Sequence, residues 1–76
     1  MKVRIIEILT EIRSEFDFNG KVNFFENGML DSFDIVTLVT AIDEEYKISI
    51  DGRDIIPDNF STVDAIINLL AKYDVK

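Results

Sequence analysis

One stretch, Asp31-Ser32-Phe33-Asp34, constrains the fold most because it opens the most apolar helical segment of the sequence. Asp31 is a favourable N-cap residue, and Asp34, three positions later, can return a hydrogen bond to complete a capping box. Apolar residues then recur at the spacing of one helical face, at Ile35, Leu38, Val39, Ile42 and Tyr46. The pattern predicts a helix over residues 32–46. Its polar face is expected to hold Asp34, Thr37, Thr40, Ala41 and Glu44.

Two further segments have helical periodicity. Residues 2–16 place Ile5, Ile8, Leu9, Ile12 and Phe16 on one face, and Gly20 follows as a terminator. The sequence Ser61-Thr62-Val63-Asp64 predicts a last helix with Ser61 as its cap and Asp64 as the box partner, ending near Tyr73. Its core face is expected to be Val63, Ile66, Ile67 and Leu70, with Leu69 at the edge. Before this last helix, residues 51–56 can form a short helix, which Pro57 ends.

The connection over residues 18–31 is long and carries two turn signals, Asn19-Gly20 and Asn27-Gly28. Between the turns, Val22, Phe24 and Phe25 are too apolar for a free linker. We therefore expect Phe24 or Phe25 to be anchored on the core. The alternative is that these aromatic side chains line a tunnel for a ligand.

These segments predict an all-α fold: a small antiparallel bundle of three main helices plus one short helix, with a long first loop. Only Ile48 and Ile50 suggest an extended piece, which is enough to fix a loop but not to build a sheet. At 76 residues, the chain is expected to form a single domain over residues 1–76. The core of a chain this short supplies no more than about 3–5 kcal/mol of net stability.

The residue inventory excludes most catalytic chemistry. The sequence has no histidine and no cysteine, which rules out Ser–His and Cys–His nucleophiles and the usual zinc ligands. Its three glycines, Gly20, Gly28 and Gly52, form no phosphate-binding loop. The acidic residues Asp51, Asp54 and Asp58 do not have the spacing of a calcium-binding loop. We therefore expect neither a metal site nor an enzyme, but a protein that binds or carries something.

Charge is concentrated in one part of the chain. Residues 26–64 hold ten acidic residues against Lys47 and Arg53, a net charge of −8 within a total of −7. This segment should repel nucleic acid and anionic membranes and attract proteins with basic patches. No apolar run approaches the roughly 18 residues of a membrane span. We expect a soluble, cytoplasmic, monomeric protein.

Three stretches together resemble the acyl carrier protein family: Asp31-Ser32-Phe33, the following Asp34-Ile35-Val36-Thr37-Leu38-Val39, and Ala41-Ile42-Asp43-Glu44-Glu45-Tyr46. In that family an Asp-Ser-Leu-type motif opens the second helix, which ends in an acidic run and an aromatic residue. The resemblance covers nearly the whole chain. It implies that a phosphopantetheinyl transferase moves phosphopantetheine from coenzyme A onto Ser32, and that the terminal thiol then carries cargo as a thioester. A phosphate ester at the start of a helix is also favoured by the helix dipole.

The resemblance further implies a surface for partner enzymes that load or condense acyl or aminoacyl groups. Its expected apolar contacts are Leu30, Phe33 and Val36, and its expected acidic contacts are Asp31, Asp34, Asp43 and Glu44. For Val36, the alternative is packing against the last helix.

Two departures bear on the cargo. The glycine at Gly28 lies one residue earlier than in bacterial fatty-acid carriers, as in D-alanyl and free-standing peptidyl carriers, and Thr37 replaces a usual glutamate. Cargo for fatty-acid, polyketide or related biosynthesis and aminoacyl cargo both remain open. The alternative outside the carrier class is an unmodified acidic protein-interaction bundle, in which Ser32 is only the residue next to the cap.

Overall fold

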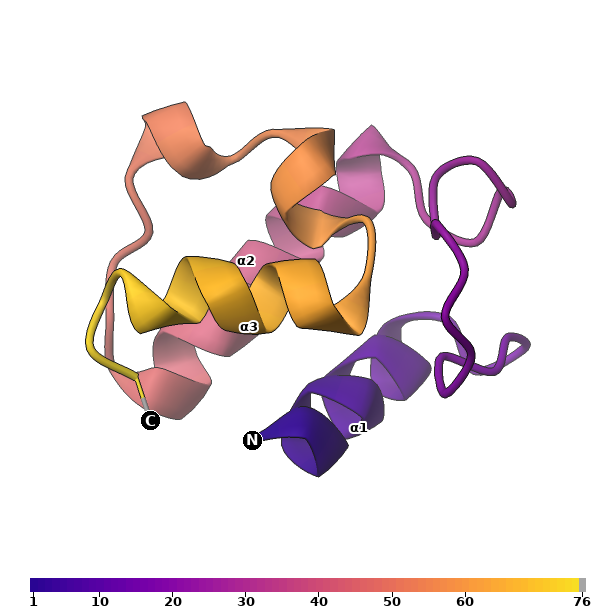
Figure 1. Cartoon of the computed structure of the whole chain (residues 1–76), viewed down its shortest axis with the longest axis horizontal. Helices are drawn as coiled ribbons and strands as arrows, with labels where there is room; N and C mark the ends of the chain where they lie inside the picture. Colours follow the sequence, from indigo (N-terminus) through magenta and orange to yellow (C-terminus); the bar gives the residue numbers. More distant parts are fainter. Residues whose placement is uncertain (76) are drawn as a thin grey trace.

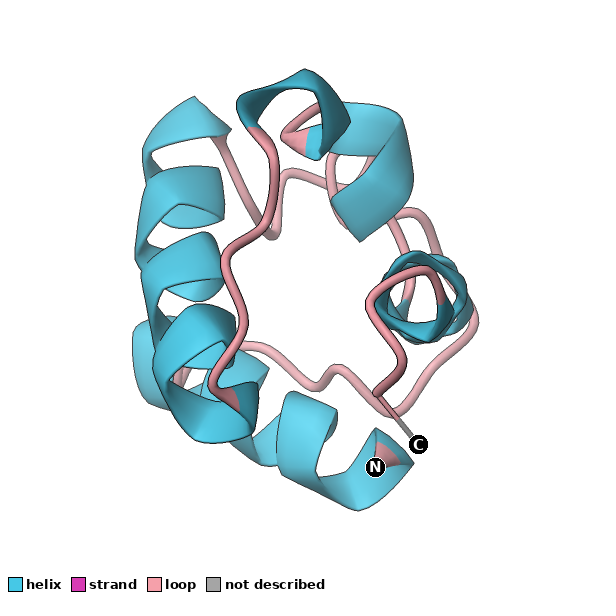
Figure 2. Ribbon diagram, turned by 90° about the vertical axis from the view of Figure 1, so that its left-hand side faces the viewer, coloured by secondary structure: helices cyan, strands magenta, loops and turns pink. Residues whose placement is uncertain are grey.

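Three α-helices and two short 3-10 helices make up the computed structural model, which describes residues 1–75. The α-helices are α1 (Lys2–Ile12), α2 (Ser32–Tyr46) and α3 (Val63–Ala71), and the 3-10 helices are η1 (Gly52–Asp54) and η2 (Pro57–Phe60). No strand occurs in the described residues (Figure 2). The all-α class is confirmed. Lys76, the last position of the expected domain, lies outside the described residues.

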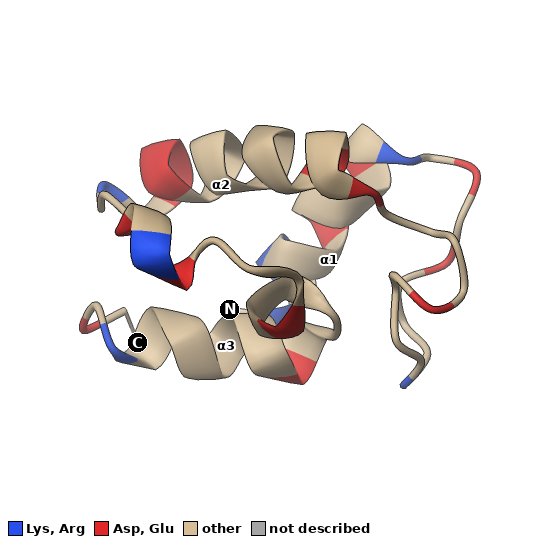
Figure 3. Cartoon of the chain, turned by 90° about the horizontal axis from the view of Figure 1, so that it is seen from above, with Lys and Arg blue, Asp and Glu red and all other residues tan. Residues whose placement is uncertain are grey.

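The helices α1 and α2 pack against each other in opposite directions. Arg4, near the start of α1, forms an ion pair of 2.9 Å with Glu45 at the end of α2. Arg13, just after α1, reaches Asp34 at the start of α2, also at 2.9 Å. In contrast, α3 runs in the same general direction as α2, because the chain crosses back between them through η1 and η2 (Figures 1 and 3). The expected antiparallel arrangement therefore holds for α1 against α2.

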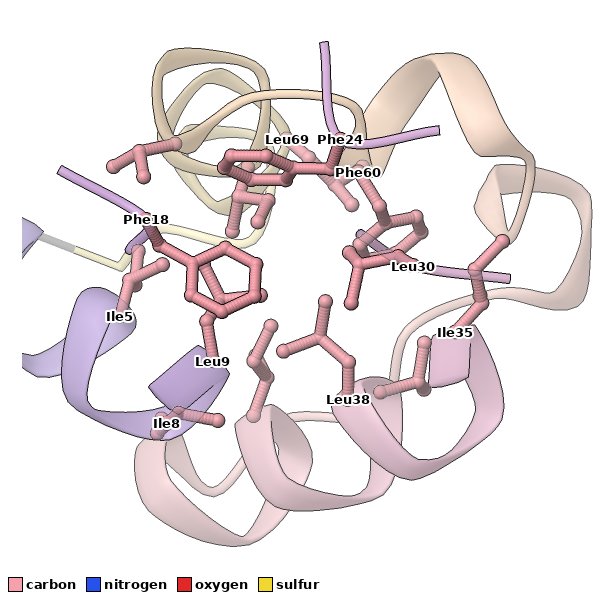
Figure 4. Packing of buried hydrophobic residues seen from close by; sticks show 14 of the residues in the cluster. Ile5, Ile8, Leu9, Phe18, Phe24, Leu30, Ile35, Leu38, Phe60 and Leu69 are labelled. Carbon is pink, nitrogen blue, oxygen red and sulfur yellow. The ribbon is translucent and has the colours of Figure 1, made fainter. Parts of the chain in front are cut away.

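The core is one continuous cluster to which all three α-helices, η2 and the first loop contribute (Figure 4). The rings of Phe18 and Phe24 meet edge to face, with centroids 5.0 Å apart and planes at 82°. This is a favourable geometry for aromatic pairs. The largest fully buried side chains are Phe18, Phe24, Phe60, Ile5, Ile8, Leu9, Leu38, Ile42, Ile66 and Leu70.

Phe24 fixes the long first loop, as one of the two expected anchors. Its ring is fully buried, whereas Phe25 is only partly buried. Its N–H group donates to the carbonyl oxygen of Ser61 at 2.7 Å, and its own carbonyl oxygen accepts from Met29 at 2.8 Å and Leu30 at 3.3 Å. The backbone just before α2 is therefore held against the start of α3. This contact fixes the position of the loop that leads into α2.

The first helix is shorter than its periodicity predicted, ending at Ile12 and not near residue 16. Arg13 leaves the helical region, with φ −134° and ψ 82°, and the chain turns there. The turn lets the Arg13 side chain reach Asp34 and lets Phe18 enter the core. Phe16 still packs against the core, but from the loop, with its ring centroid 6.5 Å from that of Phe18.

The expected cap of the last helix was wrong by one residue. Thr62, and not Ser61, is the N-cap of α3, and its hydroxyl accepts from the Ala65 N–H at 3.0 Å. Ser61 has helical backbone angles, because its hydroxyl donates to the Asp58 carbonyl oxygen and its carbonyl oxygen accepts from Phe24. With the cap at Thr62, the third helical residue is Ala65, so Asp64 is not a box partner.

Burial along α3 also differs slightly from the expected pattern. Val63, Ile66 and Leu70 are buried as expected, but Leu69 is buried as well and Ile67 only partly. The helix ends at Ala71, and a turn carries the chain to Tyr73.

The connection between α2 and α3 contains two 3-10 helices where one short helix was expected. Pro57 separates them by occupying the first position of η2. Ile50 is buried, and its N–H group donates to the Asp43 carboxylate at 3.2 Å, so this extended piece fixes the connection to α2.

Candidate functional site

The start of α2 is held by the complete capping box that the sequence predicted. The Asp34 N–H group donates to Asp31 Oδ1 at 3.0 Å, and the Asp31 N–H group donates to Asp34 Oδ2 at 3.1 Å. Asp31 itself is extended, with φ −131°, as an N-cap residue should be. The reciprocal pair satisfies two backbone donors at the helix start.

Ser32 is the first residue of α2 and is exposed. The capping box leaves the N–H groups of Ser32 and Phe33 without a hydrogen-bond partner among residues 1–75. Free N–H groups at a helix start, together with the helix dipole, favour a negatively charged group. An alcohol oxygen at this position can be reached by an enzyme, and a phosphate ester formed on it lies beside these donors.

Arg13 approaches the capping box from the end of α1. Its guanidinium group contacts Asp34 Oδ2 through Nε at 2.9 Å and Asp31 Oδ2 through an NH2 nitrogen at 3.4 Å. The hydrogen bond to Asp34, followed by the charge of that carboxylate, raises the pKa of Arg13. A permanent positive charge therefore lies beside the two acidic residues that flank Ser32.

Two of the expected apolar partner contacts are on the surface. Phe33 is 85% exposed and Val36 is 62% exposed, both within the first turns of α2. The alternative that Val36 packs against the last helix is wrong, since a packed side chain would be buried. Exposed apolar side chains beside Ser32 suit contact with a protein that approaches this residue.

Leu30 and Asp34 are buried, although the sequence suggested both as surface contacts for partner enzymes. Leu30 is only 4% exposed and packs in the core, while Asp34 is only 8% exposed. Asp34 was expected on the polar face, but its carboxylate turns inward because it bonds to the Asp31 N–H group and to Arg13. Neither side chain is available for direct contact with a partner in this conformation; both support the start of α2.

The acidic residues at the end of α2 also separate into two roles. Glu44 is exposed, whereas Asp43 is half-buried and accepts the hydrogen bond from Ile50. Figure 3 shows acidic residues at both ends of α2 with an uncharged stretch between them. The acidic surface is thus divided by the apolar and threonine-bearing middle of the helix.

Sequence reasoning missed two residues that build the site, Arg13 and Asn23, and for Phe24 it predicted the buried ring but not the backbone contacts. Arg13 pairs with the capping carboxylates, the Phe24 backbone fixes the preceding loop, and Asn23 Oδ1 accepts from the Phe25 and Glu26 N–H groups at 3.0 Å each. Asn23 has a local signal, because asparagine often bonds to the backbone two residues later. The pairing of Arg13 has no such signal, since its partners lie on another helix.

The described residues hold no cluster of three or more acidic, histidine or cysteine side chains placed to bind a metal ion. Among the same residues, no helix is both long enough and apolar enough to span a bilayer.

Comparison with known proteins bears directly on this site. A family model for the phosphopantetheine attachment site matches residues 3–70, a range that includes the capping box, all of α2, and α1 and α3 except for the first residue of α1 and the last residue of α3. The chain belongs to the acyl carrier protein family. It is also similar to the D-alanyl carrier protein of Bacillus velezensis, with 30% identity over 73 residues, which span 93% of this chain and 94% of the relative. No solved structure matches the chain.

Membership confirms the expected family and its covalently attached prosthetic group, phosphopantetheine. Members of the acyl carrier protein family carry cargo for other enzymes and are not themselves catalytic. The local structure fits the group: Ser32 offers an exposed hydroxyl, and the adjacent free N–H groups suit a phosphodiester.

Proposed function

We propose that Ser32 carries the phosphopantetheine and that the protein is a free-standing, single-domain carrier of an aminoacyl group, with D-alanyl as the first candidate. The observation that supports the attachment site is the exposed hydroxyl of Ser32 at the first position of α2, beside two free N–H groups. When bound, phosphopantetheine supplies a terminal thiol that holds cargo as a thioester.

The proposed modification is a phosphoryl transfer from coenzyme A. Ser32 Oγ forms a bond to the phosphorus that bears the pantetheine arm, and the bond from this phosphorus to the bridging pyrophosphate oxygen breaks. Adenosine 3′,5′-bisphosphate leaves, and the serine proton passes to a base of the transferase. The chain contributes the exposed hydroxyl and the favourable potential of the helix start.

Two observations support aminoacyl cargo over a long fatty or polyketide chain. The relative that spans almost the whole chain is a D-alanyl carrier. In addition, the core is filled by fully buried side chains, and one cavity beside it, between Lys2, Phe18 and Val63, measures about 70 Å³. Two larger hollows, of about 220 and 530 Å³, lie more open on the surface and are lined mainly by polar and charged side chains. Pockets that enclose a drug-sized ligand typically measure about 300–1,000 Å³. A small aminoacyl group needs no internal pocket.

The proposed partner surface comprises Asp31, Phe33, Val36 and Glu44, which are exposed on α2 and its cap. Basic patches on the transferase and on the cargo-loading enzyme would meet Asp31 and Glu44, and an apolar hollow would receive Phe33. Because Leu30, Asp34 and Asp43 are buried or tied to the backbone, we assign them to holding this surface in place.

The attachment site is tested by intact mass after incubation with coenzyme A and a broad-specificity phosphopantetheinyl transferase. The wild type should gain one phosphopantetheine, Ser32→Ala should gain none, and the matched control Ser14→Ala, at another exposed serine, should behave as the wild type. An increment that persists in Ser32→Ala would refute attachment at Ser32. An unmodified wild type would instead support the acidic interaction bundle.

Cargo class is tested by loading the protein from D-alanyl-coenzyme A and from octanoyl-coenzyme A in parallel. Neither cargo should alter the NMR signals of core methyl groups in Leu38, Ile42 or Ile66, because the packed core has no room for it. Shifts of these methyl signals with the octanoyl chain alone would indicate an internal acyl site and contradict the aminoacyl assignment.

A further inference from the structure

Arg13 makes a ring of contacts with the two acidic residues that flank Ser32. Asp34 Oδ2 accepts from Arg13 Nε at 2.9 Å and from the Asp31 N–H group at 3.1 Å. Asp31 Oδ1 accepts from the Asp34 N–H group at 3.0 Å, and Asp31 Oδ2 lies 3.4 Å from Arg13. The guanidinium group therefore joins both carboxylates of the capping box, and Ser32 lies between them in the sequence.

Because Asp34 is buried, its contact with Arg13 is important. Its side chain is 11% exposed, and a carboxylate with so little access to water needs a nearby cation or several hydrogen bonds. Without Arg13, the favourable response of Asp34 is to rotate toward water. That rotation breaks its hydrogen bond with the Asp31 N–H group and loosens the first turn of α2, where Ser32 lies.

The positive charge of Arg13 also favours attachment of a phosphodiester at Ser32. Asp31, Asp34 and Arg13 together carry a net charge of −1, whereas the two carboxylates alone carry −2. Attaching a phosphodiester at Ser32 adds another negative charge. Arg13 thus reduces the repulsion that the incoming phosphate meets at the site.

We propose that Arg13 is a positioning residue for the modification of Ser32. It holds the capping box closed, so that the Ser32 hydroxyl is presented from an ordered helix start, and it offsets the acidic charge there. This inference rests on the proposed attachment at Ser32. Arg13 need not contact coenzyme A, because its effect is transmitted through Asp34 and Asp31.

The chain provides a matched control at the opposite end of the same helix pair. Arg4 also lies on α1 and also joins α2, through Glu45 at 2.9 Å. Replacing Arg4 by glutamine removes the same charge and a similar contact between the same helices. It does so at the end of α2 that is remote in sequence from Ser32.

The experiment measures kcat and KM of a phosphopantetheinyl transferase on the full chain as wild type, Arg13→Gln, Arg13→Lys and Arg4→Gln. Arg13→Gln should lower kcat about tenfold, because a loosened helix start presents the hydroxyl correctly less often. Arg13→Lys should recover part of the loss, since an ammonium group can pair with Asp34 but lacks the planar fork that reaches both carboxylates. Arg4→Gln should keep kcat within about twofold of the wild type, since it leaves the capping box intact.

Hydrogen exchange supplies a readout independent of the transferase. The Asp31 amide, which donates to Asp34 Oδ2, and the Asp34 amide, which donates to Asp31 Oδ1, should exchange faster in Arg13→Gln, while amides in the middle of α2 keep their protection. If Arg13→Gln unfolds, the double variant Arg13→Gln with Asp34→Asn keeps the inference testable. It removes the buried charge together with its cation, and the amide oxygen of the introduced asparagine can still accept from the Asp31 N–H group, so kcat should recover.

Each contrary result has a distinct meaning. A wild type that is not modified overturns both the attachment at Ser32 and this inference. If the wild type is modified and Arg13→Gln has the same kcat, the role of Arg13 is overturned, but the attachment at Ser32 is not. Equal losses of kcat in Arg13→Gln and Arg4→Gln would also overturn it, because they would indicate a general effect of charge or stability. A double variant that folds but shows no recovery would exclude action through Asp34.

Discussion

Replacing Phe24 by leucine tests whether the buried aromatic pair fixes the first loop. Phe24 is fully buried and meets Phe18 edge to face at 5.0 Å. Losing such an aromatic pair costs about 0.5–1.5 kcal/mol, and fitting a differently shaped apolar side chain adds up to about 1.5 kcal/mol. The two contributions sum to about 0.5–3 kcal/mol, and we expect Phe24→Leu to lower the free energy of unfolding by the middle part of this range, about 1–2.5 kcal/mol.

The size of the change matters because the domain is small. A Phe→Ala substitution in a core costs about 3–5 kcal/mol, which is comparable to the whole stability expected for this chain. Leucine leaves most molecules folded and the loss measurable. For a domain of this size, the expected loss corresponds to a fall in melting temperature of roughly 4–20 °C.

Urea denaturation followed by circular dichroism measures the loss, with Phe33→Leu as the matched control. Phe33 undergoes the same chemical change but is 85% exposed, so its effect should stay within about 0.5 kcal/mol. In Phe24→Leu, the amides of Met29 and Leu30, which donate to the Phe24 carbonyl oxygen, should also exchange faster. Equal stability of the two variants would refute the assignment of Phe24 as the anchor of the loop.

Three other expectations follow from the structure. Thr62→Ala should destabilise the protein by about 1 kcal/mol because it removes the cap of α3, whereas Ser61→Ala should cost less; the reverse order in thermal denaturation would contradict the cap at Thr62. The hydrogen bond to Asp54 raises the pKa of Tyr73, and burial raises the pKa of Tyr46, so both lose their protons less readily in the folded chain. The stability that these tyrosines contribute should therefore be fully present below about pH 10 and be lost as the pH rises further; Tyr73→Phe should remove part of this loss, and parallel losses in both proteins would contradict it. Salt or Mg²⁺ should raise the melting temperature, because the acidic residues of segment 26–64 repel one another, and a melting temperature independent of salt would show that this repulsion is absent.

The local features of the site could be predicted from the sequence. Residues 32–46 form α2 as expected, and Asp31 and Asp34 form the expected capping box. Both depend on contacts between residues three or four positions apart, which the sequence spacing determines. Membership of the acyl carrier protein family could also be inferred, because the motif and the order of the helices are properties of the sequence.

Features that depend on contacts between distant segments could not be predicted. Ser61 looks like the better cap, but its carbonyl oxygen is occupied by the Phe24 N–H group from the first loop, so the cap moves to Thr62. Likewise, the apolar periodicity of the first helix continues to Phe16, yet the chain turns at Arg13. In each case a partner far away in the sequence overrides the local preference.

Asp34 shows the same division within one residue. The sequence determined that Asp34 would close the capping box, because Asp31 is three positions away and helical geometry brings the two together. It could not determine that the carboxylate would be buried, since burial of a charge requires a cation, and Arg13 arrives from another helix. The sequence alone thus determined where α2 begins and which hydroxyl it exposes. Only the tertiary structure decided which neighbouring side chains are exposed and which ones are buried or bonded to Arg13.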